Sequence, residues 1–250
     1  RTERCANNCV ECHMPSSETT LPHVAFTHHQ IGVHPRDPGA VAPENVERLV
    51  PLFDIETLSE DDRKRSLGLA WEILAVRDGR DGMNAQGREA TQRAEELLTA
   101  LPAEFVDVWV LAALTELYYL RKDLPRAAET GLKVLRKESG GPRAKIQVLL
   151  PLGIAAASEG RFSEAANYFS ELAGLRRHAD DWYFLGRCEH KLGRDDAAIR
   201  ALTTALQLDL SHIPARTLLA EIYRSQGDFD AEQRLRDELA RLSRNAQRPP

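Results

Sequence analysis

Long hydrophobic runs are missing from this 250-residue sequence. No stretch approaches the roughly 20 apolar residues that a transmembrane helix needs, so we expect no membrane span. The sequence also has no excess of positive charge: it contains 33 lysines and arginines and 38 aspartates and glutamates, which gives a formal net charge of −5. Since binding to phosphate backbones requires a clustered positive surface, a nucleic-acid partner is not expected.

Catalytic motifs are also absent. The sequence offers no nucleophile with a plausible base, no phosphate-cradling glycine loop and no carboxylate pair with a definable pocket. The glycine-rich stretch 79–87 lacks the lysine of a phosphate-binding loop and is better explained as an insertion between two helices. These absences argue against an enzyme.

Cysteine is scarce and unevenly placed. Cys5, Cys9 and Cys12 are three of only four cysteines, and five of the eight histidines lie between His13 and His34. Two metal-binding residue types concentrated at one end of a chain indicate a site there.

The spacing of Cys9, Cys12 and His13 is that of covalent haem attachment, Cys-x-x-Cys-His. Two thiols at this separation can form thioethers with the two vinyl groups of one porphyrin, and the adjoining imidazole then ligates the iron from one face. The sequence therefore predicts one haem c. Because such attachment occurs outside the cytoplasm, we expect a periplasmic or extracellular protein whose secretion signal is not part of this sequence.

Three other interpretations of these cysteines stay open. Cys5, Cys9 and Cys12 also have the spacing that holds a [4Fe–4S] cluster in radical enzymes, although that chemistry is normally housed in an α/β barrel. The same cysteines with one histidine could bind structural zinc. Two of them could form a disulfide. Zinc and a disulfide both leave most of the neighbouring histidines without a role.

The second axial ligand of the haem iron is expected to be a histidine. Met14 directly follows His13 and must lie on the same side of the ring, while the other methionine, Met83, is far along the chain. A loop long enough to fold over the ring carries the distal candidates His23, His28, His29 and His34. Two histidine ligands leave no open iron position, which favours electron transfer over catalysis.

From residue 61 onward the pattern is helical and repetitive, after the helix-start signal Ser59-Glu60-Asp61-Asp62. Residues 179–212 resemble a 34-residue tetratricopeptide unit. Its small residues Gly186 and Ala198 are expected where two paired helices cross closely. Turns between paired helices are predicted around Asp123-Leu124, Gly160-Arg161-Phe162, Gly193-Arg194 and Gly227-Asp228-Phe229. The same frame fits residues 108–141, 146–178 and, more loosely, 213–246, and a degenerate first unit covers 61–101.

The expected fold class is therefore all-α. A right-handed tetratricopeptide-repeat solenoid of about five helix pairs occupies residues 61–246, with degenerate first and last pairs. A linker covers residues 44–60, and an irregular haem-binding segment covers residues 1–43, where prolines interrupt any helical pattern. Cys188, within the repeats, is interpreted as a half-buried packing thiol.

The front segment resembles multihaem c-type cytochromes fused to tetratricopeptide repeats. Cys9 to Pro15 reads Cys-Val-Glu-Cys-His-Met-Pro, followed by His23 and by Phe26-Thr27-His28-His29-Gln30-Ile31. In that family the second segment is Phe-Thr-Asp-His-x-Ile, so the resemblance implies His29 and His23 as ligand candidates, with His29 the first choice. His28 stands where the family has aspartate and remains a rival.

The resemblance also implies electron transfer. Relatives carry several attachment motifs and this chain has one, so a spare histidine would ligate a haem on another subunit or elsewhere in a longer chain. We expect a bis-histidine haem, ligated by His13 and His29. We also expect the helical array to bind other haem proteins or copies of the chain, and repeated binding of copies would form a homopolymer. The alternatives are a scaffold subunit in which the haem is structural, and an enzyme subunit with a five-coordinate haem.

Overall fold

The computed structural model describes residues 16–17, 26–27, 58–79 and 84–246, and the chain divides into two units, Arg1–Val46 and Glu47–Pro250. In the first unit, β1 (Ser16–Ser17) pairs antiparallel with β2 (Phe26–Thr27), with Ser16 opposite Thr27. The sequence predicted only irregular structure here. Two residues per strand are too few for the alternating pattern by which a strand is recognised.

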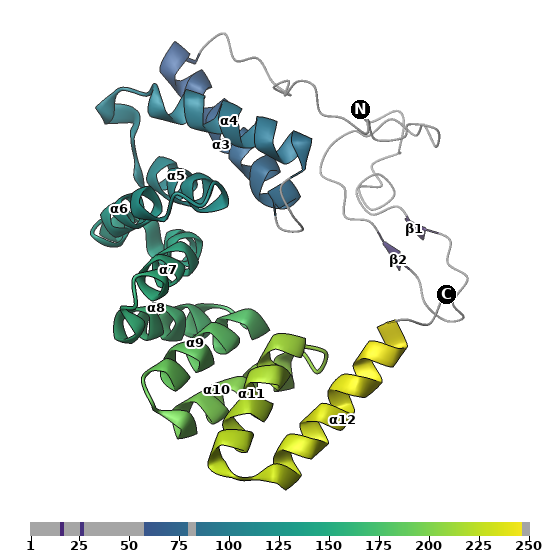
Figure 1. Cartoon of the computed structure of the whole chain (residues 1–250). Coiled ribbons are helices and arrows are strands. Elements are labelled where there is room, and N and C mark those ends of the chain that lie inside the picture. The colour runs from purple at the N-terminus through teal and green to yellow at the C-terminus, as the bar shows by residue number, and fades with distance from the viewer. Residues whose placement is uncertain (1–15, 18–25, 28–57, 80–83, 247–250) are drawn as a thin grey trace. The chain divides into compact units, whose positions relative to one another are not determined.

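The described part of the second unit consists of helices (Figure 1). The α-helices are α3 (Glu60–Gly79), α4 (Ala85–Thr99), α5 (Val108–Leu120), α6 (Leu124–Leu135), α7 (Gly141–Ser158), α8 (Phe162–Leu175), α9 (Ala179–Lys191), α10 (Asp195–Leu208), α11 (Ile213–Gln226) and α12 (Phe229–Ala246). Two short 3₁₀ turns, η1 (Ala103–Phe105) and η2 (Glu138–Gly140), precede α5 and α7.

Consecutive helices pack in pairs: α3 with α4, α5 with α6, α7 with α8, α9 with α10, and α11 with α12. The second helix of each pair contacts the first helix of the next pair. First helices also contact each other, since α5 packs on both α3 and α7, and α9 on α11. We call the side formed by these first helices the inner face. The all-helical arrangement confirms the predicted helical class.

Side chains cap several helix starts. The Ser59 hydroxyl accepts a hydrogen bond from the Asp62 N–H at 3.1 Å, which confirms the predicted start signal of α3. Asn84 accepts from the Gly87 N–H at 2.7 Å at the start of α4. At the start of α5, one Asp107 carboxylate oxygen accepts from two backbone N–H groups at 3.0 Å each. These caps satisfy N–H groups that have no partner within the helix.

Turns between paired helices lie where the sequence placed them. Gly160, Gly193 and Gly227 have φ values of 77°, 72° and 79°, in the left-handed region that glycine enters at little cost. In the turn between α5 and α6 the same role falls to Lys122, with φ 61°. One helix start was misplaced: α7 begins at Gly141, several residues before the expected unit at 146–178, with a proline in its first turn.

Paired helices cross at small residues, as predicted. A Cβ atom added to Gly186 would lie 2.8 Å from Leu202 Cγ, and one added to Gly153 would lie 2.6 Å from the Phe169 ring. Leu202 and Phe169 are fully buried, so neither can swing out of the way into solvent. Glycine at these positions is therefore required by the closeness of the helices.

Replacing Gly186 by alanine is expected to destabilise the protein by about 1–3 kcal/mol, because overpacking forces the helix pair apart. Gly174 in α8 is the matched control, since it is exposed and an added Cβ there meets no atom within 4 Å. Gly174→Ala is expected to stabilise by about 0.5–1 kcal/mol through helix propensity. Urea unfolding of both variants measures the difference; equal effects of the same sign would contradict the crossing argument.

The last helix pair is held differently. Glu232 and Arg236 stand one repeat length, 34 residues, after Ala198 and Leu202. Glu232 is buried and lies 3.0 Å from the Arg236 guanidinium. Arg216 on α11 is buried too and donates to Glu238 of α12 at 3.0 Å. Charged residues thus occupy part of the apolar crossing, and the Arg216–Glu238 pair joins the two helices, which explains the looser match of 213–246 to the repeat frame.

Candidate protein-interaction surface

The predicted haem site lies outside the described residues. This applies to Cys9, Cys12 and His13, and to the distal candidates His23, His28, His29 and His34. The haem site and its ligands therefore stay predictions from the sequence. Over residues 16–17, 26–27, 58–79 and 84–246, no group of three or more histidine, cysteine, aspartate or glutamate side chains could hold a metal ion.

Cys188 is more deeply buried than expected. It is 3% exposed and packs in a cluster with Phe169 and Phe184 rather than lying half-buried. Burial raises the pKa of the Cys188 thiol to about 11, so the thiolate is scarce at neutral pH. The packing role predicted for this residue fits its position, and its degree of burial was underestimated.

A hollow of about 380 Å³ lies between α9 and α11 on the inner face. Its lining comes from the first helices of two successive pairs: Tyr183, Arg187, His190 and Lys191 from α9, and Pro214, Thr217, Leu218 and Glu221 from α11. Aromatic, aliphatic and charged groups therefore meet in one concavity, which is the mixture that polypeptide-binding sites use.

The Arg187 guanidinium is held in place by aromatic rings. Its central carbon lies 5.6 Å from the centre of the Tyr183 ring and 5.9 Å from that of Phe184. This is cation–π distance, and it orders the side chain without neutralising its charge. Neither Arg187 nor Lys191 forms an ion pair with any residue in the described helices. Both positive charges are thus available to a ligand.

Histidine 212 fixes α11 against α9. Its Nδ1 atom accepts a hydrogen bond from the Ala215 N–H at 3.0 Å and caps α11, so in the neutral ring the proton resides on Nε2. That Nε2–H donates to the Asp180 carboxylate at 2.9 Å, and the ring lies 5.2 Å from the Tyr183 ring. One buried imidazole therefore joins the two helices that line the hollow.

The start of α9 is fixed by a second buried group. The Arg176 guanidinium donates to both Asp181 carboxylate oxygens, at 2.7 and 2.8 Å. Asp181 has no solvent exposure, and a two-point contact of this kind fixes orientation as well as distance. The inner-face side chains of α9 are thereby presented on a rigid support.

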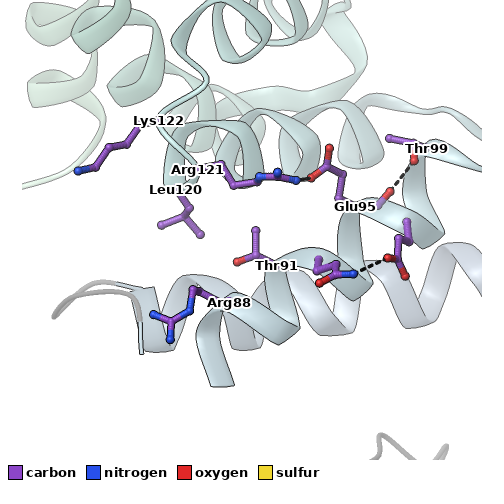
Figure 2. Close-up of a pocket in the computed structure, with 9 residues that line it drawn as sticks. Arg88, Thr91, Glu95, Thr99, Leu120, Arg121 and Lys122 are labelled. Atoms are coloured by element: carbon purple, nitrogen blue, oxygen red, sulfur yellow. Dashed lines mark hydrogen bonds and ion pairs between the residues drawn. The ribbon is translucent and has the colours of Figure 1, made fainter. Parts of the chain in front are cut away.

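A second hollow, of about 650 Å³, lies between α4 and the end of α5 (Figure 2). Arg121 pairs with Glu95 across it, and Gln92 donates to Glu96 at 2.8 Å along α4. Arg126 approaches Glu95 at 3.7 Å from α6. Arg121 and Glu95 are therefore already paired with each other, so part of the charge in this hollow is not available to a ligand.

A buried carboxylate on α3, Glu72, is subject to the charge of Glu116 on α5, and sequence reasoning missed it. Glu72 is only 6% exposed. Burial, and then the charge of Glu116, raise the pKa of Glu72 to about 7. No local pattern marks this interaction, which depends on the stacking of neighbouring first helices that the repeat frame predicts.

Comparison with known proteins agrees with the helical arrangement. Residues 156–222 match the tetratricopeptide repeat family. Among solved structures, MamA of MSR-1 superposes with a TM-score of 0.60 at 19% identity, covering 77% of this chain and 99% of that one. MamA of Desulfovibrio magneticus RS-1, beginning at its residue 41, superposes with a TM-score of 0.55 at 16% identity, covering 73% and 98%. No curated protein matches the chain.

These matches define the class of fold: a tetratricopeptide-like helical array. At such low identity they show the fold alone. Among the helices that the structure describes, none is long and apolar enough to cross a membrane.

Proposed function

We propose that this protein is a scaffold whose helical array binds a partner polypeptide on its inner face. The observation that carries the proposal is the hollow between α9 and α11, with its unpaired Arg187 and Lys191 beside Tyr183 and Leu218. Stacked helix pairs of this class create extended surfaces that bind other proteins, and aromatic residues with arginine dominate the energetics of such contacts. The partner is a second copy of the chain or another protein.

Charge reversal at this hollow tests the scaffold proposal. Arg187→Glu/Lys191→Glu is expected to weaken binding of the native partner, or self-association of the chain, at least tenfold, because two like charges would face the ligand's acceptors. The matched control is Arg200→Glu/Arg234→Glu, which alters two exposed arginines on α10 and α12. Sedimentation equilibrium measures self-association, and quantitative mass spectrometry of co-purified proteins measures partners. Equal losses in both double variants would contradict the proposed site.

We further propose that the front of the chain carries one haem c attached to Cys9 and Cys12, with His13 and His29 as axial ligands. The support is the attachment motif itself and the concentration of histidines after it. His23 and His28 are the rival distal ligands. With two histidines on the iron the haem would transfer electrons rather than bind a substrate, and the protein would act in the periplasm or outside the cell.

The short ladder adds support for this ligand pair. β1 begins three residues after His13, and β2 ends two residues before His29. Because Ser16 pairs with Thr27 in antiparallel register, the start of β1 and the end of β2 share one end of the ladder. Both proposed ligands adjoin that end in sequence. His28, the residue directly after β2, adjoins the same end, so the ladder favours His29 or His28 over His23, which lies between the two strands in sequence.

The two proposals join in one function. A single haem needs another redox centre close by before it can pass electrons on, and a scaffold that binds haem proteins or copies of itself would supply one. The helical array would then determine how close the haem lies to the next redox centre. The alternative is a scaffold in which the haem only stabilises the front segment; a haem that resists both oxidant and reductant in the purified protein would favour it.

A further inference from the structure

The hollow between α9 and α11 carries more positive than negative charge. Arg187 and Lys191 are exposed and form no ion pair with any described residue. His190 lines the same hollow, and its Nδ1 atom lies 2.6 Å from the Asp195 carboxylate, which fixes the ring. Among the described residues that line the hollow, Glu221 is the only carboxylate. A ligand matched to this lining carries several acidic groups and few basic ones.

Apolar surface continues from the hollow along α11. Pro214 and Leu218 line it, and Tyr183 faces them from α9. Ile213 is 51% exposed and shares a helix face with Thr217, whose hydroxyl donates to the Ile213 carbonyl at 3.0 Å. The matched ligand therefore also brings aliphatic or aromatic side chains, which exclude water from the charged contacts.

One segment of this chain has that composition. Residues 44–57, which lie outside the described residues, read Glu-Asn-Val-Glu-Arg-Leu-Val-Pro-Leu-Phe-Asp-Ile-Glu-Thr. Four of these side chains are acidic and one, Arg48, is basic. Phe53 and several aliphatic side chains alternate with them. Both the charge and the apolar content of the segment are complementary to the hollow.

We propose that the hollow between α9 and α11 binds residues 44–57 of a second copy of the chain. The inference rests on the proposed scaffold function and names the partner that its site takes. Carboxylates of the segment pair with Arg187 and Lys191, and its single arginine pairs with Glu221. Its apolar side chains cover Tyr183 and Leu218. Each copy offers one hollow and one segment, so the copies associate head to tail.

The place of the hollow in the array favours a second copy over the same chain. The segment directly precedes Leu58 and α3, whereas α9 and α11 begin the fourth and fifth helix pairs (Figure 1). Packed helices lie about 8–10 Å apart, so the steps from α3 through α5 and α7 to α9 cover roughly 25–30 Å. Because an extended chain spans at most about 3.6 Å per residue, Asp54 and Glu56 cannot reach the hollow of their own chain.

Mixing two full-length variants tests the inference. The hollow variant, Arg187→Glu/Lys191→Glu, keeps the segment intact. The segment variant keeps the hollow intact and replaces the four acidic residues of the segment by their amides: Glu44→Gln, Glu47→Gln, Asp54→Asn and Glu56→Gln. The control, Arg200→Glu/Arg234→Glu, alters two exposed arginines outside both. Sedimentation velocity measures association of each protein alone and in equimolar mixtures, and circular dichroism verifies that each variant is folded.

The wild-type chain and the control are expected to self-associate alike, and the hollow and segment variants, each alone, at least tenfold more weakly. The mixture of these two variants should regain association and stop at a 1:1 complex, because one intact hollow and one intact segment remain in each pair of chains. This result also distinguishes binding between copies from binding within one chain, which mixing cannot restore.

Three results would overturn the inference: a mixture that stays monomeric, a segment variant that self-associates as strongly as the wild type, or a wild-type chain that is monomeric at every concentration. If the hollow variant nevertheless loses self-association or its co-purified native partner, the scaffold proposal stands while this inference fails. If the hollow variant keeps every association of the wild type, both fail.

Discussion

Replacing both Cys9 and Cys12 by alanine is expected to give a chain without covalent haem. The wild-type chain, produced in the periplasm of a host that attaches haem c, should keep the mass of one haem after denaturation and show a haemochrome spectrum in alkaline pyridine. The double variant loses both thioethers, and with them every covalent link to the porphyrin. The effect is all-or-none, because His13 alone binds haem only reversibly.

Three control variants distinguish covalent haem attachment at Cys9 and Cys12 from the other interpretations of the cysteines. Cys5→Ala and Cys188→Ala should keep the haem, since Cys5 lies outside the attachment motif and Cys188 is buried between helices. His29→Ala should keep the covalent haem but change its spectrum from six-coordinate to one that binds carbon monoxide readily. A wild-type chain that is colourless, or that carries zinc or an iron–sulfur cluster instead, would contradict the haem proposal and leave the helical array untouched.

Replacing Glu72 by glutamine is expected to stabilise the protein at pH 8 and to have little effect near pH 4.5. Burial and Glu116 raise the pKa of Glu72 from 4.5 to about 7 in the folded chain, while the unfolded chain has the ordinary value. The folded state therefore binds the extra proton between these values, and stability falls as pH rises from about 4.5 to 7. Glutamine resembles the protonated acid and removes this loss.

The expected gain at pH 8 is about 3 kcal/mol at most, from the conversion of a pKa difference into free energy. For a domain of this size that corresponds to a rise in Tm of at most roughly 6–12 °C. Differential scanning calorimetry of the wild-type chain, Glu72→Gln and the exposed control Glu221→Gln at pH 5 and pH 8 measures it. A Glu72→Gln variant less stable than wild type at pH 8 would show that a cation already neutralises the carboxylate.

The helical half of the fold was predictable because its determinants are local and periodic. Gly186 and Gly153 mark helix crossings, Gly160 and Gly193 mark turns, and each recurs at a fixed place in the repeat. Residue spacing alone could locate them. In every helix pair the two helices cross closely and the chain then reverses direction, and each step requires a small residue or a glycine at a fixed position.

The contacts that shape the inner face were not predictable in the same way. His212 forms a hydrogen bond with Asp180, and the charge of Glu116 acts on Glu72, in each case between different helix pairs. Sequence separation within one unit says nothing of such pairs, since they depend on how successive units rotate against each other. Glutamate and histidine are usually surface residues, so nothing in the sequence marks Glu72 or His212 as buried. Their burial is seen only in the folded array.

Site-specific photo-crosslinking in cells that produce the protein natively tests the central claim most directly. A photoreactive phenylalanine analogue would replace Thr217, in the hollow between α9 and α11, or Thr203, an exposed threonine on α10. The inner-face account predicts a discrete crosslinked polypeptide from position 217 and none from position 203. Crosslinks of equal yield from both positions, or from position 203 alone, would contradict it.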